Sequence, residues 1–285
     1  MHKTEDWLYE IKPKGKFIDL NLKEIWRYRD LLVLFIKRDI VTVYKQTILG
    51  PLWFLIQPLL TAVVLTLIFN NLANLDYGTT PPFLFNLASV ILWNYFKKCL
   101  SVSSSTFTQN ASLFGKVYFP RVIVPLSKAL SGLLELLIQL LILIVFYLIY
   151  LYNGAQLTPS TEVALLPVLL LIIILLGVGT GLILSAMTTK YRDLSNLVSF
   201  GLSLLMYLSA VPYTIKEAQS KLGAYSWVID YNPLAHIIDS FRNAVLGAGA
   251  VNYITLAYAA LIAIAAAFLG LIVFNRTEKT FIDTV

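Results

Sequence analysis

Ionisable side chains occur inside otherwise apolar stretches of this 285-residue sequence. Lys97 and Lys98 interrupt one such stretch, and Glu135 interrupts the next. Charges inside a bilayer are costly and usually face protein or water. If the two stretches are antiparallel helices, Lys97 and Glu135 come at comparable depths and could pair. Two other interpretations stay open: the lysines snorkel to the cytoplasmic face, or these residues line an aqueous path.

A second set of polar residues follows the fifth apolar stretch. Its spacing brings Asp230, His236, Asp239 and Arg242 into one short segment. Clustered acids and a histidine at one membrane face could serve an intramembrane enzyme, such as a glycosyl or phosphoryl transferase acting on a polyprenyl lipid. A transferase of this kind is therefore one hypothesis for the function of the chain.

Metal and nucleotide chemistry have little support in the sequence. One cysteine, Cys99, and two histidines, His2 and His236, cannot assemble a metal site of ordinary ligand count. No GxxxxGK[ST] phosphate-binding loop occurs, so any ATP would be hydrolysed by another chain. We expect no catalytic residue, cofactor or metal on this chain.

The composition identifies the class of protein. Hydrophobic residues make up 58% of the chain and charged residues 13%, with a mean hydropathy of +0.75. A soluble domain carries about 25% charged residues, so too few remain here to cover a water-facing surface. The sequence predicts an all-α integral membrane protein.

Six stretches are long enough to cross a bilayer as helices, which requires about 20 apolar residues each. A further segment, 217–250, is broken by glycine, proline and charge, and we expect it to be interfacial or re-entrant. The expected spans are 49–70, 83–105, 123–150, 163–187, 194–215 and 251–274.

The positive charges predict the orientation of these spans. Of the 22 Lys and Arg residues, only Lys216, Lys221 and Arg242 lie outside the segments that an even number of spans would place in the cytoplasm. Both termini are therefore expected to be cytoplasmic. The net charge of +6 follows this pattern and does not argue for nucleic acid.

The segment from Leu20 to Tyr44 is amphipathic at helical spacing. It could be a surface anchor, or a helix that senses a partner or an anionic lipid. Gly50 and Pro51 then allow a turn into the first span, and Pro58 is expected to kink it. The apolar face is expected to contain Leu22, Ile25, Trp26, Leu32, Phe35 and Ile36.

Several of these pieces occur in an order that resembles a known family. The ordered set is similar to the transmembrane subunit of ABC-2 type polysaccharide exporters, which export O-antigen, capsule or teichoic acid. The matching pieces are YRDLLVLFIKRDI (28–40), YKQTILGPLW (44–53), GKVYFPRVIVPL (115–126), YRDL (191–194), YNPL (231–234) and FRNAVLG (241–247).

The resemblance implies a fold and a division of the chain. Residues 1–48 would form a cytoplasmic amino terminus with an interface helix, and 49–285 a six-helix ABC-2 transmembrane domain acting as a homodimer. Within it, 217–250 would form the re-entrant helices of an external gate.

The resemblance also implies roles for individual residues. The interface helix would form a lateral gate, with Arg38, Lys45 and Gln46 at the pyrophosphate end of the substrate, in agreement with the affinity of cations for phosphate. External-gate candidates are Asn232, Pro233, His236 and Arg242. Candidates for coupling to an ATPase are Asn110, Phe114, Lys116, Tyr118, Arg121, Tyr191, Arg192 and Asp193. Translocation-path candidates are Lys97, Lys98, Glu135, Trp93, Tyr95 and Phe96.

The implied partners are a second copy of the chain, two ABC ATPase subunits that hold ATP and Mg²⁺, membrane lipid, and a polyprenyl-pyrophosphate-linked glycan. The implied location is the bacterial inner membrane. Lys97 and Lys98 depart from the neutral residues that the resemblance leads us to expect there, which implies either a more polar path or an ion pair with Glu135. The alternatives are a different amphiphilic cargo, such as a drug or a lipid, the transferase described above, or a purely structural membrane subunit.

Overall fold

The computed structural model describes residues 22–45, 52–157, 160–191 and 193–281. Within these ranges the chain forms helices joined by loops and contains no strand. The all-α prediction is therefore confirmed for the described part of the chain. The predicted domain boundary at 48/49 lies outside it.

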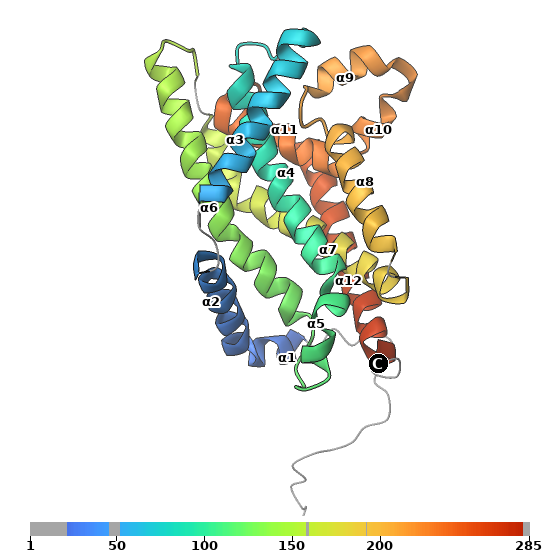
Figure 1. Ribbon diagram of the computed structural model, residues 1–285. Helices are drawn as coiled ribbons and strands as arrows, with labels where there is room; N and C mark the ends of the chain where they lie inside the picture. Colours follow the sequence, from blue (N-terminus) through green and yellow to red (C-terminus); the bar gives the residue numbers. More distant parts are fainter. Residues whose placement is uncertain (1–21, 46–51, 158–159, 192, 282–285) are drawn as a thin grey trace, which may run out of the picture.

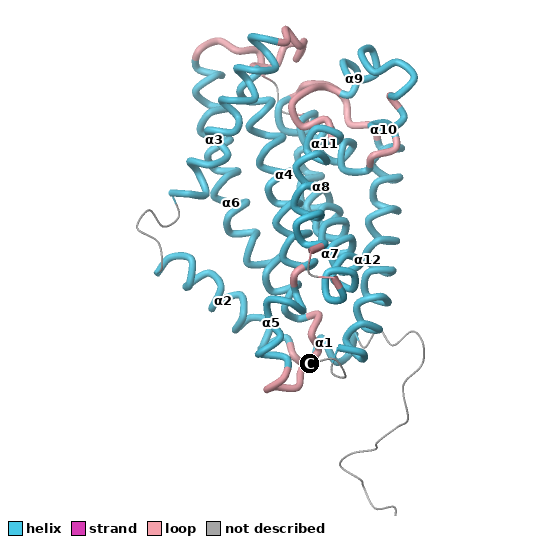
Figure 2. The backbone as a smooth tube through the Cα atoms, turned by 45° about the vertical axis from the view of Figure 1, so that its right-hand side comes forward, coloured by secondary structure: helices cyan, strands magenta, loops and turns pink. Residues whose placement is uncertain are grey.

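The predicted amphipathic segment forms two helices, α1 (Leu22–Arg27) and α2 (Arg29–Lys45). They lie obliquely across one end of the molecule, where α2 packs on α6 (Figures 1 and 2). Phe35 is buried, and Ile25 and Leu32 pack against the core. Trp26 was expected on the same face but stays 72% exposed.

The longest helices run alongside one another between the two ends of the molecule (Figures 1 and 2). Helix α3 (Trp53–Leu65) continues as the π-helical segment η2 (Thr66–Leu72), and a 3-10 turn, η3 (Thr161–Leu165), leads into α7. The others are α4 (Pro82–Ser104), α6 (Ile123–Tyr152), α7 (Leu166–Lys190), α8 (Leu194–Leu208) and α12 (Tyr253–Phe281).

Four of these helical segments are long and apolar enough to cross a membrane: Trp53–Leu72, Ile123–Tyr152, Thr161–Lys190 and Tyr253–Glu278. Helix α4, with 23 residues, has sufficient length, but its lysines, asparagines and serines dilute its hydropathy. Helix α8 has 15 residues and spans about 22 Å at 1.5 Å per residue. The structure thus supports a multi-pass membrane protein.

Helix α8 ends at Leu208, earlier than the 215 expected for the fifth span. Ala210 takes a left-handed conformation with φ of 52°, which cannot continue a right-handed helix. The Asn232 side-chain amide donates to the carbonyl of Leu208, 2.9 Å away, and to the Ser209 hydroxyl, 3.0 Å away. A tertiary contact therefore satisfies the end of this helix.

The segment expected to be re-entrant forms short helices at the end opposite α2 and α5 (Thr106–Phe114) (Figure 1). These are α9 (Ile215–Leu222), η4 (Gly223–Tyr225) and α10 (Trp227–Asp230). Helix α11 (Pro233–Leu246) follows, with Pro233 in its first turn. The Asn232 side chain caps it by accepting from the Leu234 amide. Two of the external-gate candidates, Asn232 and Pro233, thus form the start of this helix.

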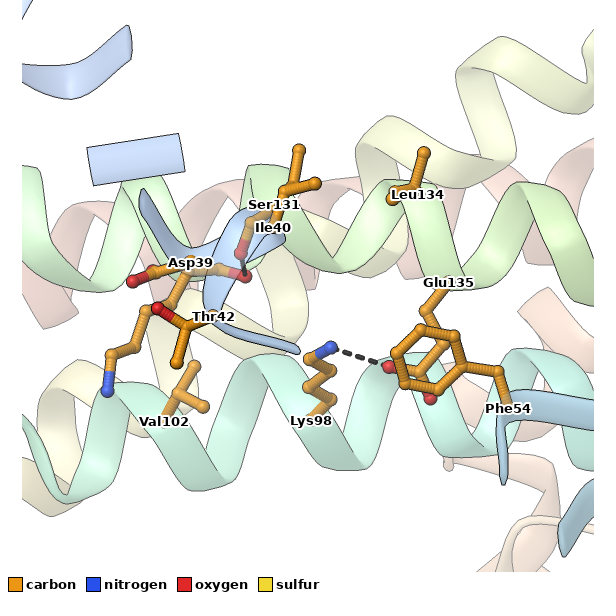
Figure 3. Close-up of a pocket in the computed structure, with 10 residues that line it drawn as sticks. Asp39, Ile40, Thr42, Phe54, Lys98, Val102, Ser131, Leu134 and Glu135 are labelled. Atoms are coloured by element: carbon orange, nitrogen blue, oxygen red, sulfur yellow. Dashed lines mark hydrogen bonds and ion pairs between the residues drawn. The ribbon is translucent and has the colours of Figure 1, made fainter. Parts of the chain in front are cut away.

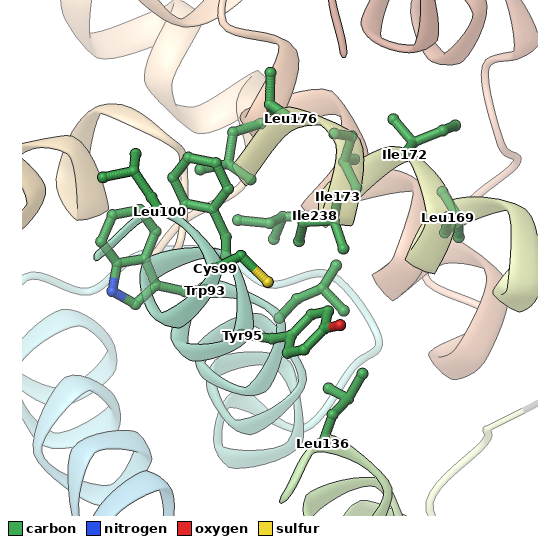
Figure 4. Close-up of a cluster of buried hydrophobic side chains, with 14 of the residues drawn as sticks. Trp93, Tyr95, Cys99, Leu100, Leu136, Leu169, Ile172, Ile173, Leu176 and Ile238 are labelled. Atoms are coloured by element: carbon green, nitrogen blue, oxygen red, sulfur yellow. The ribbon is translucent and has the colours of Figure 1, made fainter. Parts of the chain in front are cut away.

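The core joins α4, α6, α7 and α11 (Figure 4). Small residues allow α7 to approach two helices at once. A Cβ atom at Gly177 or Gly181 would meet α4, whereas one at Gly179 would lie against the backbone of Ala267 in α12. Gly270 of α12 faces Gly179 at the same crossing. The glycines of α7 thus set the spacing of the core helices.

We expect Gly179→Ala to destabilise the protein by about 1–3 kcal/mol, because the added methyl group forces two backbones apart. Gly201→Ala is the matched control, since a Cβ atom at that position in α8 meets nothing within 4 Å. Both substitutions raise the intrinsic helix propensity by the same amount, so this contribution cancels in the comparison. Thermal unfolding in detergent would measure the difference, and equal midpoints would contradict close packing at Gly179.

Candidate functional site

A cavity of about 260 Å³ lies between the surface helix α2 and the long helices α3, α4 and α6 (Figure 3). Four elements that are distant in sequence contribute to it. Its lining combines two lysines and two acids with apolar and hydroxyl side chains: Asp39, Ile40, Thr42, Phe54, Lys98, Val102, Lys128, Ser131, Leu134 and Glu135. An amphiphile with a charged end matches this chemistry.

An ion pair lies on the wall of this cavity. The Lys98 ammonium of α4 lies 2.6 Å from the Glu135 carboxylate of α6 (Figure 3). Lys98 is also 5.9 Å from the centre of the Phe54 ring. Both side chains are only partly exposed, 33% for Lys98 and 24% for Glu135. Each charge therefore offsets part of the free-energy cost of placing the other near apolar groups.

Of the interpretations that the sequence left open, the structure supports an ion pair of Glu135, but its partner is Lys98 and not Lys97. Consecutive residues of a helix point about 100° apart, so the two lysines cannot share one partner on α6. Lys97 is exposed and forms no ion pair with any residue that the structure describes.

The residues predicted for the pyrophosphate end of a substrate are only partly described. The Arg38 guanidinium lies 2.8 Å from the Asp39 carboxylate and 4.6 Å above the Phe35 ring. Its charge is thus engaged within α2, and a phosphate would have to compete with Asp39. The Lys45 side chain and all of Gln46 lie outside the described residues.

The aromatic path candidates are part of the core. Trp93, Tyr95 and Phe96 are each 3% exposed, and Figure 4 shows Trp93 and Tyr95 among packed aliphatic side chains. The Tyr95 hydroxyl donates to the Ala129 carbonyl, 3.2 Å away. In this structure the three rings hold α4 against its neighbours and do not line the cavity.

The coupling candidates divide into an exposed group and an internal group. The candidates from Asn110 to Arg121 lie in α5 (Thr106–Phe114) and the loop that follows it, and α5 is at the same end of the molecule as α1 and α2 (Figure 1). Tyr118 is 82% exposed, and Lys116 is also exposed in the loop that follows. Phe114 and Arg121 are buried. Asn110 is half-buried, and its amide donates to the Thr106 carbonyl 2.8 Å away.

The short connection between α7 and α8 also carries exposed side chains. Tyr191 is 53% exposed and Asp193 is exposed. Arg192 lies outside the described residues. Tyr118, Lys116, Tyr191 and Asp193 therefore offer side chains to a partner, whereas Phe114 and Arg121 support the loop from inside.

An aromatic row connects the surface helix to the last span through the α5 loop. Sequence reasoning missed three of its members, since a phenylalanine in a loop or span gives no sign of its partner. Each ring contacts the next one in the row. The distances between neighbouring ring centres are 5.8 Å for Phe35–Phe119, 5.9 Å for Phe119–Phe114, 6.0 Å for Phe114–Phe107 and 4.6 Å for Phe107–Phe274. Such pairs add packing energy beyond their buried area.

Arg121 reinforces this connection. Its guanidinium lies 5.1 Å over the Phe114 ring and 3.7 Å from the Glu278 carboxylate of α12, and it donates to the Glu278 carbonyl. Burial lowers the pKa of Arg121, and the Glu278 carboxylate opposes this by raising it. An arginine remains charged under such conditions, so the loop and α12 are held by a permanent ion pair.

At the opposite end, Arg242 is fully buried. Its guanidinium lies 2.9 Å from the Asp239 carboxylate and 4.1 Å over the Phe85 ring. It also donates to the carbonyls of Ala210, 2.9 Å away, and Tyr213, 3.2 Å away. Arg242 therefore joins α11 to α4 and to the turn after α8.

The other outer candidates are also occupied by structural contacts. His236 lies 2.7 Å from the backbone carbonyl of Asp230, and its ring packs edge-on against Tyr258. The described residues contain no group of three or more His, Cys, Asp or Glu side chains able to hold a metal. The acids and histidine of this segment are thus separate anchors within the fold.

Residues 30–246 match the family model for the ABC-2 type transporter. The match covers the cavity, the α5 loop and the outer helices. The chain belongs to the ABC-2 type transporter family.

Known relatives align with nearly the whole of this ABC-2 transporter chain. An O-antigen export system permease protein RfbA of Klebsiella pneumoniae is 29% identical over 89% of this chain and 94% of its own length. The protein of the same name from Myxococcus xanthus is 27% identical over 78% of this chain and 82% of its own length. The polysialic acid transport protein KpsM of Escherichia coli is 22% identical over 87% and 93% of the two chains.

In this ABC-2 transporter, we expect Lys98→Met to cost about 1–3 kcal/mol of unfolding free energy, because it leaves the Glu135 charge unpaired near apolar groups. Lys98→Met combined with Glu135→Leu should cost less than Lys98→Met alone. Lys97→Met is the neighbouring control and should have little effect. Unfolding in detergent tests this order, and equal losses for Lys97→Met and Lys98→Met would contradict it.

Proposed function

We propose that this chain is the membrane-spanning subunit of an exporter that moves a lipid-pyrophosphate-linked polysaccharide across the bacterial inner membrane. The match of 89% of the chain to an O-antigen export permease carries this proposal. The cavity beneath α2 supports it, because a charged and apolar lining suits an amphiphile that has a phosphate end.

The proposed topology has six spans, α3–η2, α4, α6, η3–α7, α8 and α12, with both termini in the cytoplasm. Although α4 is polar and α8 is short, both run alongside the apolar helices (Figure 2). The segment α9 to α11 would form a re-entrant external gate. A second copy of the chain would cover apolar side chains that α8 leaves exposed, among them Leu197, Phe200 and Leu204.

Energy would come from two ABC ATPase subunits that carry ATP and Mg²⁺, with no cofactor on this chain. They would dock where α1, α2 and α5 meet, on the exposed Lys116, Tyr118, Tyr191 and Asp193. The aromatic row from Phe35 to Phe274 would carry their movement to α2 and α12. Substrate would enter near α2, where Arg38 could exchange Asp39 for a pyrophosphate oxygen.

The transferase hypothesis is the weaker alternative. It needs acids or histidines free to act on a substrate. Asp239 is paired with Arg242, and His236 is bound to the backbone of Asp230, so each already has a structural role. An ABC-2 permease for a drug or another lipid is the closer alternative. It differs from the proposed function only in the molecule that is transported, so the identity of the cargo distinguishes the two.

The decisive experiment purifies the chain in lipid with its partner ATPase and measures ATP hydrolysis with and without a polyprenyl-pyrophosphate glycan. We expect the glycan to stimulate hydrolysis, and Arg38→Ala to weaken that stimulation. Stimulation by drugs or phospholipids alone would favour the other cargo. Turnover of the lipid-linked glycan by this chain without an ATPase would favour the transferase.

We expect Tyr118→Ala to weaken binding of the ATPase by about 1–2 kcal/mol, or roughly 5–30-fold in Kd, because an exposed loop tyrosine is a typical interface anchor. Tyr152→Ala is the matched control, since Tyr152 is 92% exposed at the opposite end. Titration of the reconstituted chain with the ATPase would measure both. Equal affinities would place the docking surface elsewhere.

A further inference from the structure

Pro58 lies inside α3 and is buried. Proline has no backbone N–H, so the carbonyl four residues earlier in the helix, that of Phe54, loses its intrahelical donor. An unsatisfied backbone group within hydrocarbon costs several kcal/mol, and a proline in a span is tolerated where a neighbouring helix or an ordered water supplies the missing donor. The question is therefore which group donates to the Phe54 carbonyl.

Gln139 of α6 supplies it. Its side-chain amide nitrogen lies 3.1 Å from the Phe54 carbonyl oxygen and donates to it. Gln139 is only 3% exposed and Phe54 is half-buried, so this contact is partly shielded from solvent. The donor that α3 lacks thus comes from a neighbouring helix.

The amide of Gln139 is in turn held by the ion pair. The same nitrogen lies 3.4 Å from one carboxylate oxygen of Glu135, and the other oxygen lies 2.6 Å from the Lys98 ammonium. An amide has two N–H groups, one for each acceptor. A continuous polar relay therefore runs from Lys98 through Glu135 and Gln139 to the Phe54 carbonyl, across α4, α6 and α3.

The relay adjoins the cavity beneath α2. Lys98, Glu135 and Phe54 all line that cavity, on the side opposite Asp39 and Thr42 of α2 (Figure 3). The direction of the first turn of α3 therefore helps to set the cavity's shape. Pro58 removes the hydrogen bond that would tie this turn to the rest of α3, and the relay ties the turn to α6 instead.

We propose that Gln139 is a positioning residue whose amide replaces the hydrogen bond that Pro58 removes from the first span. The Lys98–Glu135 pair orients this amide, and the relay holds the first turn of α3 against α6 so that the cavity beneath α2 keeps its shape. The use of that cavity for substrate rests on the proposed function, whereas the relay itself does not.

A double-mutant cycle between Pro58 and Gln139 tests the relay. Pro58→Ala returns a backbone N–H to the Phe54 carbonyl, so Gln139 becomes dispensable for that atom. We expect Gln139→Leu to lower the unfolding midpoint in the native background and to lower it by less than half as much in the Pro58→Ala background. Equal losses in both backgrounds, the result for a glutamine that merely fills space, would overturn the proposal.

Gln57→Leu is the matched control, because Gln57 is an exposed glutamine of α3, the helix that contains Pro58. It should lower the midpoint equally little in both backgrounds. If the loss of midpoint caused by Gln57→Leu depended on Pro58 as strongly as the loss caused by Gln139→Leu, the proposal would be overturned. Such a result would show a general effect of proline on α3.

Spin labels at Leu52 and Leu137, which are 51% and 54% exposed, report the position of α3 against α6 in a Cys99→Ala chain. We expect Gln139→Leu to broaden the distance distribution, and Pro58→Ala in the same chain to narrow it again. An unchanged distribution in Gln139→Leu would overturn the positioning role.

Glycan-stimulated ATP hydrolysis links the relay to export. Pro58→Ala should fold at least as stably as the native chain and yet lose most of the stimulation, because the first turn of α3 is then bonded within its own helix and no longer depends on α6. Native stimulation in Pro58→Ala would overturn the role of this link in shaping the cavity. A native chain that shows no stimulation would instead contradict the proposed function, while the unfolding cycle still decides the relay.

Discussion

The hydrocarbon interior of a bilayer offers no hydrogen-bond partners, so the backbone N–H and C=O groups of a spanning segment must find theirs within the protein or in a water-filled cavity. The most informative residues of this chain follow from that constraint. Lys98 and Glu135 neutralise each other, and Gln139 joins their pair to a backbone carbonyl that Pro58 leaves open. Polar side chains thus bind three helices together where lipid alone would provide no cohesion.

Between these polar contacts, the helices are held by close packing. The glycines of α7 bring it against both α4 and α12, and the aromatic side chains of α4 fill the remaining space. Because lipid tails are as apolar as leucine, such shape complementarity has to replace the hydrophobic effect in a membrane. The tightest crossings form a rigid centre to which the two ends of the molecule are attached.

Two arginines secure those ends in different ways. Arg242 is fully buried and ties the turn after α8 to α11 and α4. Arg121 ties the α5 loop to the end of α12 beside the aromatic row that begins at Phe35. The surface helix is therefore part of a continuous contact path through the loop to the last span. A movement imposed on the loop would reach α2 without passing through the rigid centre.

The sequence by itself determined the membrane class and the approximate limits of most of the long helices. These features depend on local hydropathy and on backbone chemistry, which each segment carries alone. Its motifs also indicated the family that the matching of residues 30–246 established. The involvement of Lys98 and Glu135 was predictable because charges in apolar stretches stand out.

Only the tertiary structure decided which lysine pairs, because the rotation of α4 against α6 selects Lys98 over Lys97. It also decided that α8 ends at Leu208, where the amide of Asn232 satisfies the last turn. The aromatic row and the link from Gln139 to Phe54 join residues far apart in the sequence. No local pattern contains such pairings, since they depend on which helix faces meet when the chain is folded.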